Sequence, residues 1–168
     1  MLTRLVERGI ISRLKPGTFR LVPFELGFER EYLGNPLLVA RELATKSLTK
    51  NTDKLKPDYY ISHCSAFELH QMVTQPQMIT YVTSPWLIRT KTIQGTEFRF
   101  VRCKSENLFG LTEIWIDKNE KVQVSDLERT LLDGLKHPKY CGGITEVAKG
   151  FSIKRDLINS LRVVEYAI

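Results

Sequence analysis

Residues able to bind a ligand or transfer a proton are concentrated in VSDLERTLLDGLKHPKYCGGI, residues 124–144. If this stretch is helical, each residue turns by about 100° and four polar side chains share one face: Asp126, Arg129, Thr130 and Asp133. That face can contact an anionic ligand or a partner through its guanidinium and carboxylates. It can equally pair within the helix, because Asp126 precedes Arg129 by three residues and Asp133 follows it by four. The spacing leaves both interpretations open.

The same stretch carries signals that place a helix directly after a strand. Val122 and Val124 predict the end of a strand, and Ser125 with Glu128 has the spacing of a capping box, in which both side chains bond to backbone N–H groups at a helix start. We expect the leucines of the opposite arc to face the core; they are Leu127, Leu131, Leu132 and Leu135. Strand and helix should therefore join without a loop.

Glycines and histidines suggest two further kinds of site. Gly142 and Gly143 precede an expected helix, so their N–H groups can form an anion-binding nest or simply allow a tight turn. The sequence contains no phosphate-binding loop and no GxGxxG pattern. His63, His70 and His137 also lack the CxxC and HExxH spacings of metal sites. Motifs alone therefore predict no metal, no cofactor and no catalytic residue.

Basic residues are unevenly distributed along the chain. The net charge is +6 and the isoelectric point about 9.3, which indicates an anionic partner. Residues 1–22 contain one acid, Glu7, and five bases, which are Arg4, Arg8, Arg13, Lys15 and Arg20. Most of the excess positive charge therefore lies in the N-terminal 22 residues.

A second basic group lies on an expected hairpin and comprises Arg89, Lys91, Arg99, Arg102 and Lys104. Aromatic and basic side chains together can clamp single-stranded nucleic acid. Phe98 and Phe100, however, alternate with the bases along one strand. This alternation favours phenylalanines that face the core and bases that face solvent.

Length, hydropathy and cysteine content limit the class of protein. At 168 residues the chain can form one domain, or one domain and a small appendage. It has no apolar run near the roughly 20 residues of a membrane span and no signal-peptide pattern. Its cysteines, Cys64, Cys103 and Cys141, are too few and scattered for a disulfide framework. We therefore expect a soluble cytoplasmic protein that does not act at a membrane.

The basic front of the chain predicts a short helix and a hairpin. Leu2, Leu5 and Val6 fall on one helical face, which Gly9 is suited to end. Two strands follow, joined by the turn formers of residues 16–17. This order occurs at the end of a winged helix, where the helix enters the DNA major groove and the hairpin contacts the backbone. A helix–hairpin cap on the main domain is the alternative.

The rest of the chain alternates predicted helices and strands. Asn35 with Pro36 is a helix start, and Ser65 with Glu68 is a second capping box. The predicted helices span 36–49, 65–73, 144–151 and 153–164 besides the one after residue 125, and the predicted strands span 79–83, 86–93, 96–103, 111–116 and 122–124. The expected fold is α+β, with a sheet of four to five strands and packed helices.

Four runs of sequence resemble one known family. They are NPLLVAREL, YYISHCSAFELH, FGLTEIWI and VSDLERTLLDGLKHPKYCGGITEVAKGF, and the similarity spans nearly the whole chain. They resemble the AbiEi family, the antitoxin component of type IV toxin–antitoxin, or abortive infection, systems. The resemblance implies part of a winged helix in residues 1–30 and a mixed α/β antitoxin domain in residues 31–168.

The resemblance also implies a function for each part. The winged helix would bind operator DNA and repress the operon, with Arg4 and Arg8 facing DNA and with phosphate contacts from Arg13, Lys15 and Arg20. The antitoxin domain would counter a nucleotidyltransferase-type toxin without forming a stable complex. The residues that match the antitoxin signature of the family are Ser125, Asp126, Glu128, Arg129, Thr130, Asp133, Gly142 and Gly143.

Two alternative functions remain. One is an enzyme that modifies the toxin or a nucleotide by phosphotransfer, with Asp126 or Asp133 as acid, base or metal ligand and Arg129 on phosphate. The other is a folded but inert remnant. The resemblance further implies that the first helices of the family's winged helix are missing from residues 1–168 and that relatives continue into a further C-terminal region. We therefore expect apolar surface around Leu161 and Val164, which a second copy of the chain or a neighbouring chain would cover.

Overall fold

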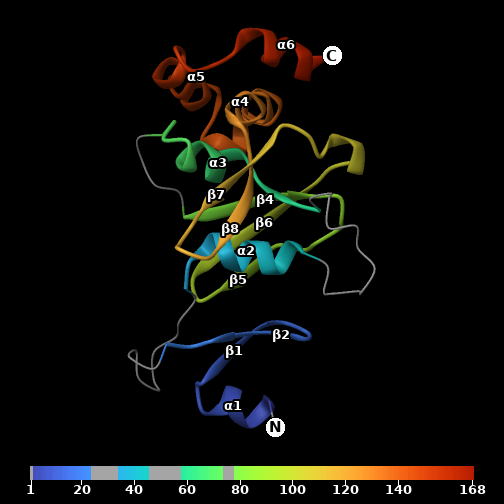
Figure 1. The fold of residues 1–168 in the computed structure, drawn as a ribbon, viewed down its shortest axis with the longest axis vertical. Helices are drawn as coiled ribbons and strands as arrows, with labels where there is room; N and C mark the ends of the chain where they lie inside the picture. Colours follow the sequence, from blue (N-terminus) through green and yellow to red (C-terminus); the bar gives the residue numbers. More distant parts are fainter. Residues whose placement is uncertain (1, 24–33, 46–57, 74–77) are drawn as a thin grey trace.

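The structure, a computed structural model, describes residues 2–23, 34–45, 58–73 and 78–168. Its elements confirm an α+β fold, in which helices pack around a mixed β-sheet. The molecule is elongated, with the N-terminal helix and hairpin at one end and the last two helices at the other (Figure 1). None of the helices in these residues is long and apolar enough to cross a membrane.

The main sheet joins strands from residues 60 to 125. Within the described residues it has six strands in the order β5-β6-β4-β3-β8-β7. Their bounds are β3 Tyr60–Ile61, β4 Ile79–Ser84, β5 Lys91–Ile93, β6 Thr96–Arg102, β7 Leu111–Trp115 and β8 Lys121–Ser125. β3 is antiparallel to β4 and parallel to β8, and β4 is parallel to β6. The antiparallel hairpins β5–β6 and β7–β8 lie at the two sides.

The prediction of a sheet of four or five strands omitted β3, the shortest strand. β3 has two residues, yet it pairs with β4 on one side and with β8 on the other, so it joins the two halves of the sheet. The strand predicted over residues 86–93 is wrong for its first five residues, since only Lys91–Ile93 pair with β6. Gln94 and Gly95 both have positive φ, the geometry of a tight two-residue hairpin turn, which fixes where that strand ends.

Helix α2, Pro36–Ala44, begins as predicted and ends earlier. Asn35 Oδ1 accepts the Leu37 N–H at 2.9 Å, the capping bond expected of this side chain. The predicted helix is wrong at Thr45, which has an extended backbone and whose hydroxyl donates to the Arg41 carbonyl at 2.8 Å. Residues 46–49 of that predicted helix lie outside the described residues.

Helix α3, His63–Leu69, begins before the predicted capping box. Ser65 lies inside the helix, where its Oγ accepts the Tyr81 N–H at 2.9 Å and donates to the Ile79 carbonyl at 3.3 Å. The box of Ser65 with Glu68 is therefore wrong, because this serine ties α3 to β4 and leaves no oxygen for a cap. The first helical residue has φ +51°, in the left-handed region that few side chains adopt.

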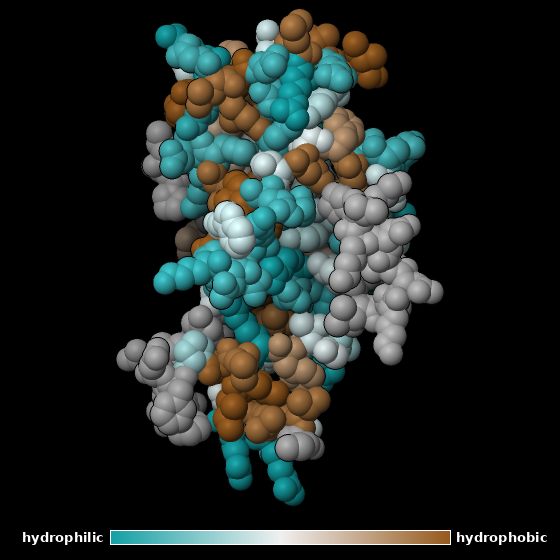
Figure 2. Space-filling model, viewed as in Figure 1, coloured by the Kyte–Doolittle hydropathy of each residue, from teal (hydrophilic) through white to brown (hydrophobic). Residues whose placement is uncertain are grey.

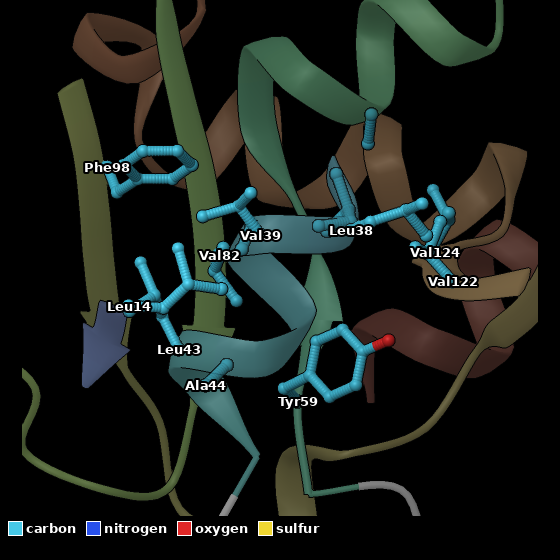
Figure 3. Close-up of a cluster of buried hydrophobic side chains, with 13 residues drawn as sticks. Leu14, Leu38, Val39, Leu43, Ala44, Tyr59, Val82, Phe98, Val122 and Val124 are labelled. Atoms are coloured by element: carbon cyan, nitrogen blue, oxygen red, sulfur yellow. The ribbon is translucent and has the colours of Figure 1, made fainter. Parts of the chain in front are cut away.

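One hydrophobic core packs α2 against the sheet (Figure 3). Val39 and Leu43 of α2 cluster with Val82 of β4 and Phe98 of β6. Phe98 is fully buried, so the phenylalanine that alternates with the hairpin bases does face the core. Leu14 of the N-terminal hairpin belongs to the same cluster. The hairpin therefore packs on the body of the protein.

A second cluster centres on Phe67 of α3 and involves two helices of the C-terminal part. These are α4, Leu127–Lys136, and α5, Ile144–Lys154. A Cβ atom built at Gly134 of α4 or at Gly150 of α5 would lie 2.7 Å or 2.9 Å from carbons of the Phe67 ring. Glycine at both positions therefore lets the two helices approach this ring closely.

The boundary between the last two helices differs from the prediction. The predicted break near residues 150–152 is wrong, because α5 continues to Lys154. Gly150 lies inside this helix and lets it pack closely against Phe67 of α3. The break falls at residues 155–159. Asn159 Oδ1 then accepts the N–H groups of Leu161 and Arg162, which caps helix α6, Ser160–Ala167.

The N-terminal element comprises α1, Leu2–Glu7, and a hairpin of β1, Ile11–Lys15, and β2, Thr18–Leu21. The predicted helix and hairpin are confirmed, and Gly9 takes φ +67° between them. None of the described residues of α1 is buried. Apolar atoms gather on the face of this end that Figure 2 shows. The exposed large apolar side chains of the element include Leu2, Val6, Ile10 and Leu21. The predicted domain boundary at residues 30–31 lies outside the described residues, so the division into domains stays a prediction.

Candidate functional site

The polar face of α4 begins at a cap that differs from the predicted one. Asp126 is the N-cap residue, and its Oδ1 accepts the Arg129 N–H at 2.8 Å. Ser125 ends β8 instead, with its Oγ 2.7 Å from Thr130 Oγ1. The capping box of Ser125 with Glu128 is therefore wrong, because the serine hydroxyl is engaged inside the fold and the next residue supplies the capping oxygen. The strand does pass into the helix without a loop, as predicted.

The polar residues of α4 and its cap point inward. Four of them are buried: Asp126, Glu128, Thr130 and Asp133. On the predicted apolar arc, Leu131 is buried but Leu135 is 51% exposed. The expectation that all four leucines face the core is wrong for Leu135, because β3 and α6 offer hydrogen-bond partners that the polar side chains turn towards.

Arg129, Asp133 and Tyr60 form a buried triangle between α4 and β3. Arg129 Nε donates to Asp133 Oδ1 at 3.0 Å, and the Tyr60 hydroxyl donates to Asp133 Oδ2 at 3.0 Å. Arg129 Nη2 donates to the Tyr60 oxygen at 3.3 Å, and its guanidinium lies 4.2 Å from the centre of the Phe109 ring. Burial raises the pKa of the Asp133 carboxyl, although the charge of Arg129 opposes this. Arg129 and Asp133 thus form the internal pair that their spacing allowed.

Asp126 and Glu128 hold the C-terminal helix against α4. The Tyr166 hydroxyl donates to Asp126 Oδ2 at 2.8 Å, and Arg162 Nη2 lies 3.1 Å from the same oxygen. Glu128 Oε1 accepts the Asn159 N–H at 2.9 Å, immediately before α6. Both carboxylates are thus engaged inside the protein, and a partner reaches them only if α6 moves.

Gly142 and Gly143 have positive φ values of +81° and +102°. They follow η3, the 3-10 helix Pro138–Cys141, and both of their N–H groups bond to the Pro138 carbonyl. An anion-binding nest requires N–H groups that are free to bond to the anion. The geometry therefore favours the alternative interpretation, in which the glycines make a tight turn into α5.

A pocket of about 580 Å³ lies beside the buried triangle and is lined in part by Arg129 and Asp133. Its buried lining includes Tyr60, Thr83 and His63. Its exposed lining includes Arg102, Lys104 and Lys136. The 3-10 turn η2, Ser105–Asn107, also borders it. The pocket thus connects an exposed basic rim with buried polar side chains.

His63 is the buried group of this pocket whose bonding is incomplete. The residue is 2% exposed, and its Nδ1 lies 2.8 Å from Ser62 Oγ, which accepts the Thr83 hydroxyl at 2.8 Å. Its Nε2 is buried and has no hydrogen-bond partner among the described residues. Burial lowers the pKa of His63 to about 3, with smaller contributions from His137 and Arg129. The imidazole is therefore neutral at pH 7.

A second pocket, of about 830 Å³, lies between α4 and the end of α6. Tyr166 and Ile168 line it, and it shares Arg129, Asp133 and Lys136 with the first pocket. Arg129 and Asp133 therefore stand between the two cavities. They are the residues of the predicted polar face through which a ligand in either cavity would contact α4.

The five predicted DNA-contacting residues fall into two groups. Arg4 of α1, Arg8 just after it and Arg13 of β1 are exposed. Lys15 donates to the Thr45 carbonyl beyond the end of α2, and burial lowers its pKa. Arg20 is partly buried, with its guanidinium against Gly34. The structure therefore leaves three of the five exposed and engages the other two with the body of the protein.

Sequence reasoning missed several residues of the first pocket. It considered His63 only as a metal ligand and gave no role to Tyr60, Thr83 or Lys136. Tyr60 and Asp133 bond across 73 residues, and no spacing rule links segments that only the sheet brings together. The one usable sign was the pair of bases, Arg102 and Lys104, at the end of a predicted strand.

The chemistry available to the site is narrow. The hydroxyls of Ser125 and Thr130 are buried and bonded to each other, so neither is poised as a nucleophile. Burial raises the pKa of Cys64 to about 11 and that of Cys141 to about 12, so both remain thiols. In the described part of the chain, no group of three or more His, Cys, Asp or Glu side chains could hold a metal ion. No protein-family model matches the chain, and no curated protein matches it.

Proposed function

We propose that this chain is the antitoxin of a type IV toxin–antitoxin system, that it acts in the cytoplasm against a nucleotidyltransferase-type toxin, and that it regulates its own operon. The observation that carries the regulatory half is the exposure of Arg4, Arg8 and Arg13. These arginines have no ion-pair partner among the described residues. They lie in the part of the chain whose resemblance to the AbiEi family implies contact with DNA.

The three arginines suit contacts with a DNA backbone. Arg4 and Arg8 are four residues apart at α1 and its C-terminal end, and Arg13 extends from the adjacent strand. Guanidinium groups on phosphates provide affinity that falls steeply as salt rises, and they carry little sequence information. We therefore expect retention of operator DNA that weakens strongly between about 50 and 200 mM salt.

An electrophoretic mobility shift with the DNA upstream of the reading frame tests this half. The variant Arg4→Ala/Arg8→Ala/Arg13→Ala should lose retention. A matched control, Arg89→Ala/Lys118→Ala/Arg155→Ala, removes three exposed bases elsewhere and should retain the DNA. Equal loss in both variants, or no retention of DNA by the unaltered protein at low salt, would contradict the regulatory role.

The antitoxin half rests on the segment from Val124 to Gly143, which carries the most specific resemblance to the family. Within it, Arg129 and Asp133 line both cavities. Arg129→Ala/Asp133→Ala should therefore fail to rescue cells from the cognate toxin. Gly134→Ala, which strains the same helix against Phe67, is the control for lost stability. If the double variant is folded and still rescues, these two residues are not the antitoxin site.

The enzymatic alternative is favoured by one observation, the position of Arg129 and Asp133 on the wall of a pocket. Phosphotransfer would place phosphate on Arg129 and use Asp133 as base. Transfer of labelled phosphate from a nucleotide to the toxin, under conditions where the antitoxin rescues, would support it. Rescue without any transfer would exclude it as the mechanism.

A further inference from the structure

We propose that the pocket of about 580 Å³ beside α4 binds a small phosphomonoester, with Arg102 and Lys136 on the phosphate and His63 beside the bound molecule. This inference does not depend on the antitoxin proposal. It follows from three properties of the pocket: the charge of its lining, the incomplete bonding of its buried imidazole, and its size.

The lining carries an unbalanced positive charge. Its charged side chains are those of Arg102, Lys104, Arg129, Lys136, Glu106 and Asp133. Asp133 pairs with Arg129 at 3.0 Å, and Glu106 pairs with Lys104 at 3.3 Å. Arg102 and Lys136 have no ion-pair partner among the described residues, so the pocket presents two uncompensated cations. A phosphomonoester carries a charge of about −1.5 to −2 at pH 7, which matches them.

The buried side of the pocket offers a polar atom that the protein leaves without a partner. Tyr60 and Thr83 donate their hydroxyl hydrogens to Asp133 and Ser62, so their donors are used. His63 Nε2 has no bond within the described residues, and buried polar atoms are normally paired. When Ser62 donates to Nδ1, the proton of the neutral ring is on Nε2, an unpaired donor behind the accessible wall of the pocket, which an oxygen of the ligand contacts once that wall adjusts.

Size and lining favour a phosphorylated molecule over a bare anion. A volume of about 580 Å³ is in the range of small-molecule sites, and much larger than one phosphate group. Pro85 and Val101 add apolar surface that a carbon skeleton would cover. The exposed cations lie at the rim and the buried imidazole lies deeper. The phosphate is therefore placed at the rim, with the rest of the molecule towards His63.

Isothermal titration of the full chain with ribose 5-phosphate, in about 50 mM salt, tests the proposal. Ribose 5-phosphate should bind, and ribose should not. Inorganic phosphate should bind more weakly than the sugar phosphate, because it lacks the part of the ligand that reaches the buried wall. Binding of ribose as tight as that of its phosphate, or no binding of either phosphate, would overturn the proposal.

Substitutions at the rim identify the site. Arg102→Gln/Lys136→Gln changes two exposed side chains and should weaken binding of ribose 5-phosphate at least tenfold. The matched control Arg89→Gln/Lys118→Gln should change Kd less than twofold. Equal weakening in both variants would mean that the anion is attracted by the basic surface as a whole, and this would overturn the assignment.

Nuclear magnetic resonance of the imidazole nitrogens tests the position of the ligand without changing the charge of the protein. Saturating ribose 5-phosphate should shift the His63 Nε2 resonance, assigned with the variant His63→Asn, and leave that of His70 in place. His70 is the internal reference, because its Nε2 already donates to the Ser125 carbonyl at 2.7 Å. An unshifted His63 resonance at saturation would show that the ligand binds elsewhere.

Discussion

The N-terminal element and helix α4 both carry several charged side chains, and they use them in opposite ways. Arg4, Arg8 and Arg13 extend from α1 and β1 into solvent. The side chains of Arg129 and Asp133 are 11% and 8% exposed, and they bond to each other and to Tyr60. The same residue types are therefore free at one end of the molecule and fixed near the other.

This difference shows that partners, rather than charge itself, decide whether a polar residue is available for binding. A charge removed from water must be paired and hydrogen-bonded, so the polar side of α4 is part of what holds the helix in place. An exposed charge contributes little to stability and keeps its capacity for an external anion. Substitutions in the two regions should accordingly separate stability from binding.

The largest effect is expected at the centre of the buried triangle. Asp133→Ala leaves Arg129 buried without its carboxylate and should lower the free energy of unfolding by about 3–5 kcal/mol. Urea unfolding followed by circular dichroism measures this. Asp156→Ala is the control, since its side chain is 88% exposed and its loss should cost under about 0.5 kcal/mol. Equal losses in both variants would erase the distinction between the regions.

The next effect is a pH dependence that arises from His63. Its folded pKa of about 3 lies below the unfolded value of 6.5, so below pH 6.5 the unfolded state binds a proton that the folded state does not. Stability from this group is complete above pH 6.5 and falls by about 1.4 kcal/mol per unit as the pH drops towards 4. The difference between the unfolding free energies of the unaltered chain and of His63→Asn isolates this slope. A difference that is constant with pH would contradict it.

A smaller effect is expected at the start of α4. Asp126→Ala removes both the cap of α4 and the tether to α6, and should cost about 1–2 kcal/mol. Tyr166→Phe removes one bond of the tether and the exposed bond that the hydroxyl accepts from Arg162 Nε, and should cost about 0.5–1 kcal/mol. Thermal unfolding of the two variants ranks these losses. If Tyr166→Phe costs as much as Asp126→Ala, the cap contributes nothing measurable.

The smallest effect on stability is expected at the N-terminal end. Arg4→Ala/Arg8→Ala/Arg13→Ala should change the free energy of unfolding by less than about 0.5 kcal/mol, because these side chains are exposed. Urea unfolding of this variant provides the stability control for the mobility-shift experiment. A loss above about 1 kcal/mol would mean that the arginines support the fold, and the contrast with α4 would disappear.

Residues with strong local preferences allowed correct predictions of several elements. Asn35 and Pro36 start α2, Gly9 follows the end of α1, and Gln94 with Gly95 makes the turn of the β5–β6 hairpin. Each of these signals acts within a few residues, through one backbone conformation or one capping bond. The α+β class followed from the same local patterns.

The candidate site could not be predicted in the same way. Ser65 and Ser125 had the spacing of capping boxes, but Ser65 bonds to β4 and Ser125 to Thr130, so tertiary contacts replaced the local cap. The prediction that the polar side chains of α4 share one side of the helix was correct. Which side is buried could not be predicted, because this depends on contacts with β3 and α6, and both elements lie far away in sequence.

The attachment of α6 has a consequence for how the protein opens. None of its described residues is buried, and polar bonds from Asp126 and Glu128 hold the helix and the residue that caps it. Such a segment can detach while the sheet and α3 stay folded. Amide hydrogens of residues 161–167 should then exchange with solvent through a low-energy local event, whereas those of β8 and α4 should exchange only when the whole domain unfolds. We therefore expect residues 160–167 to open as a separate unit, since two carboxylates and the contact of the Tyr166 ring with Phe109 hold them to the rest.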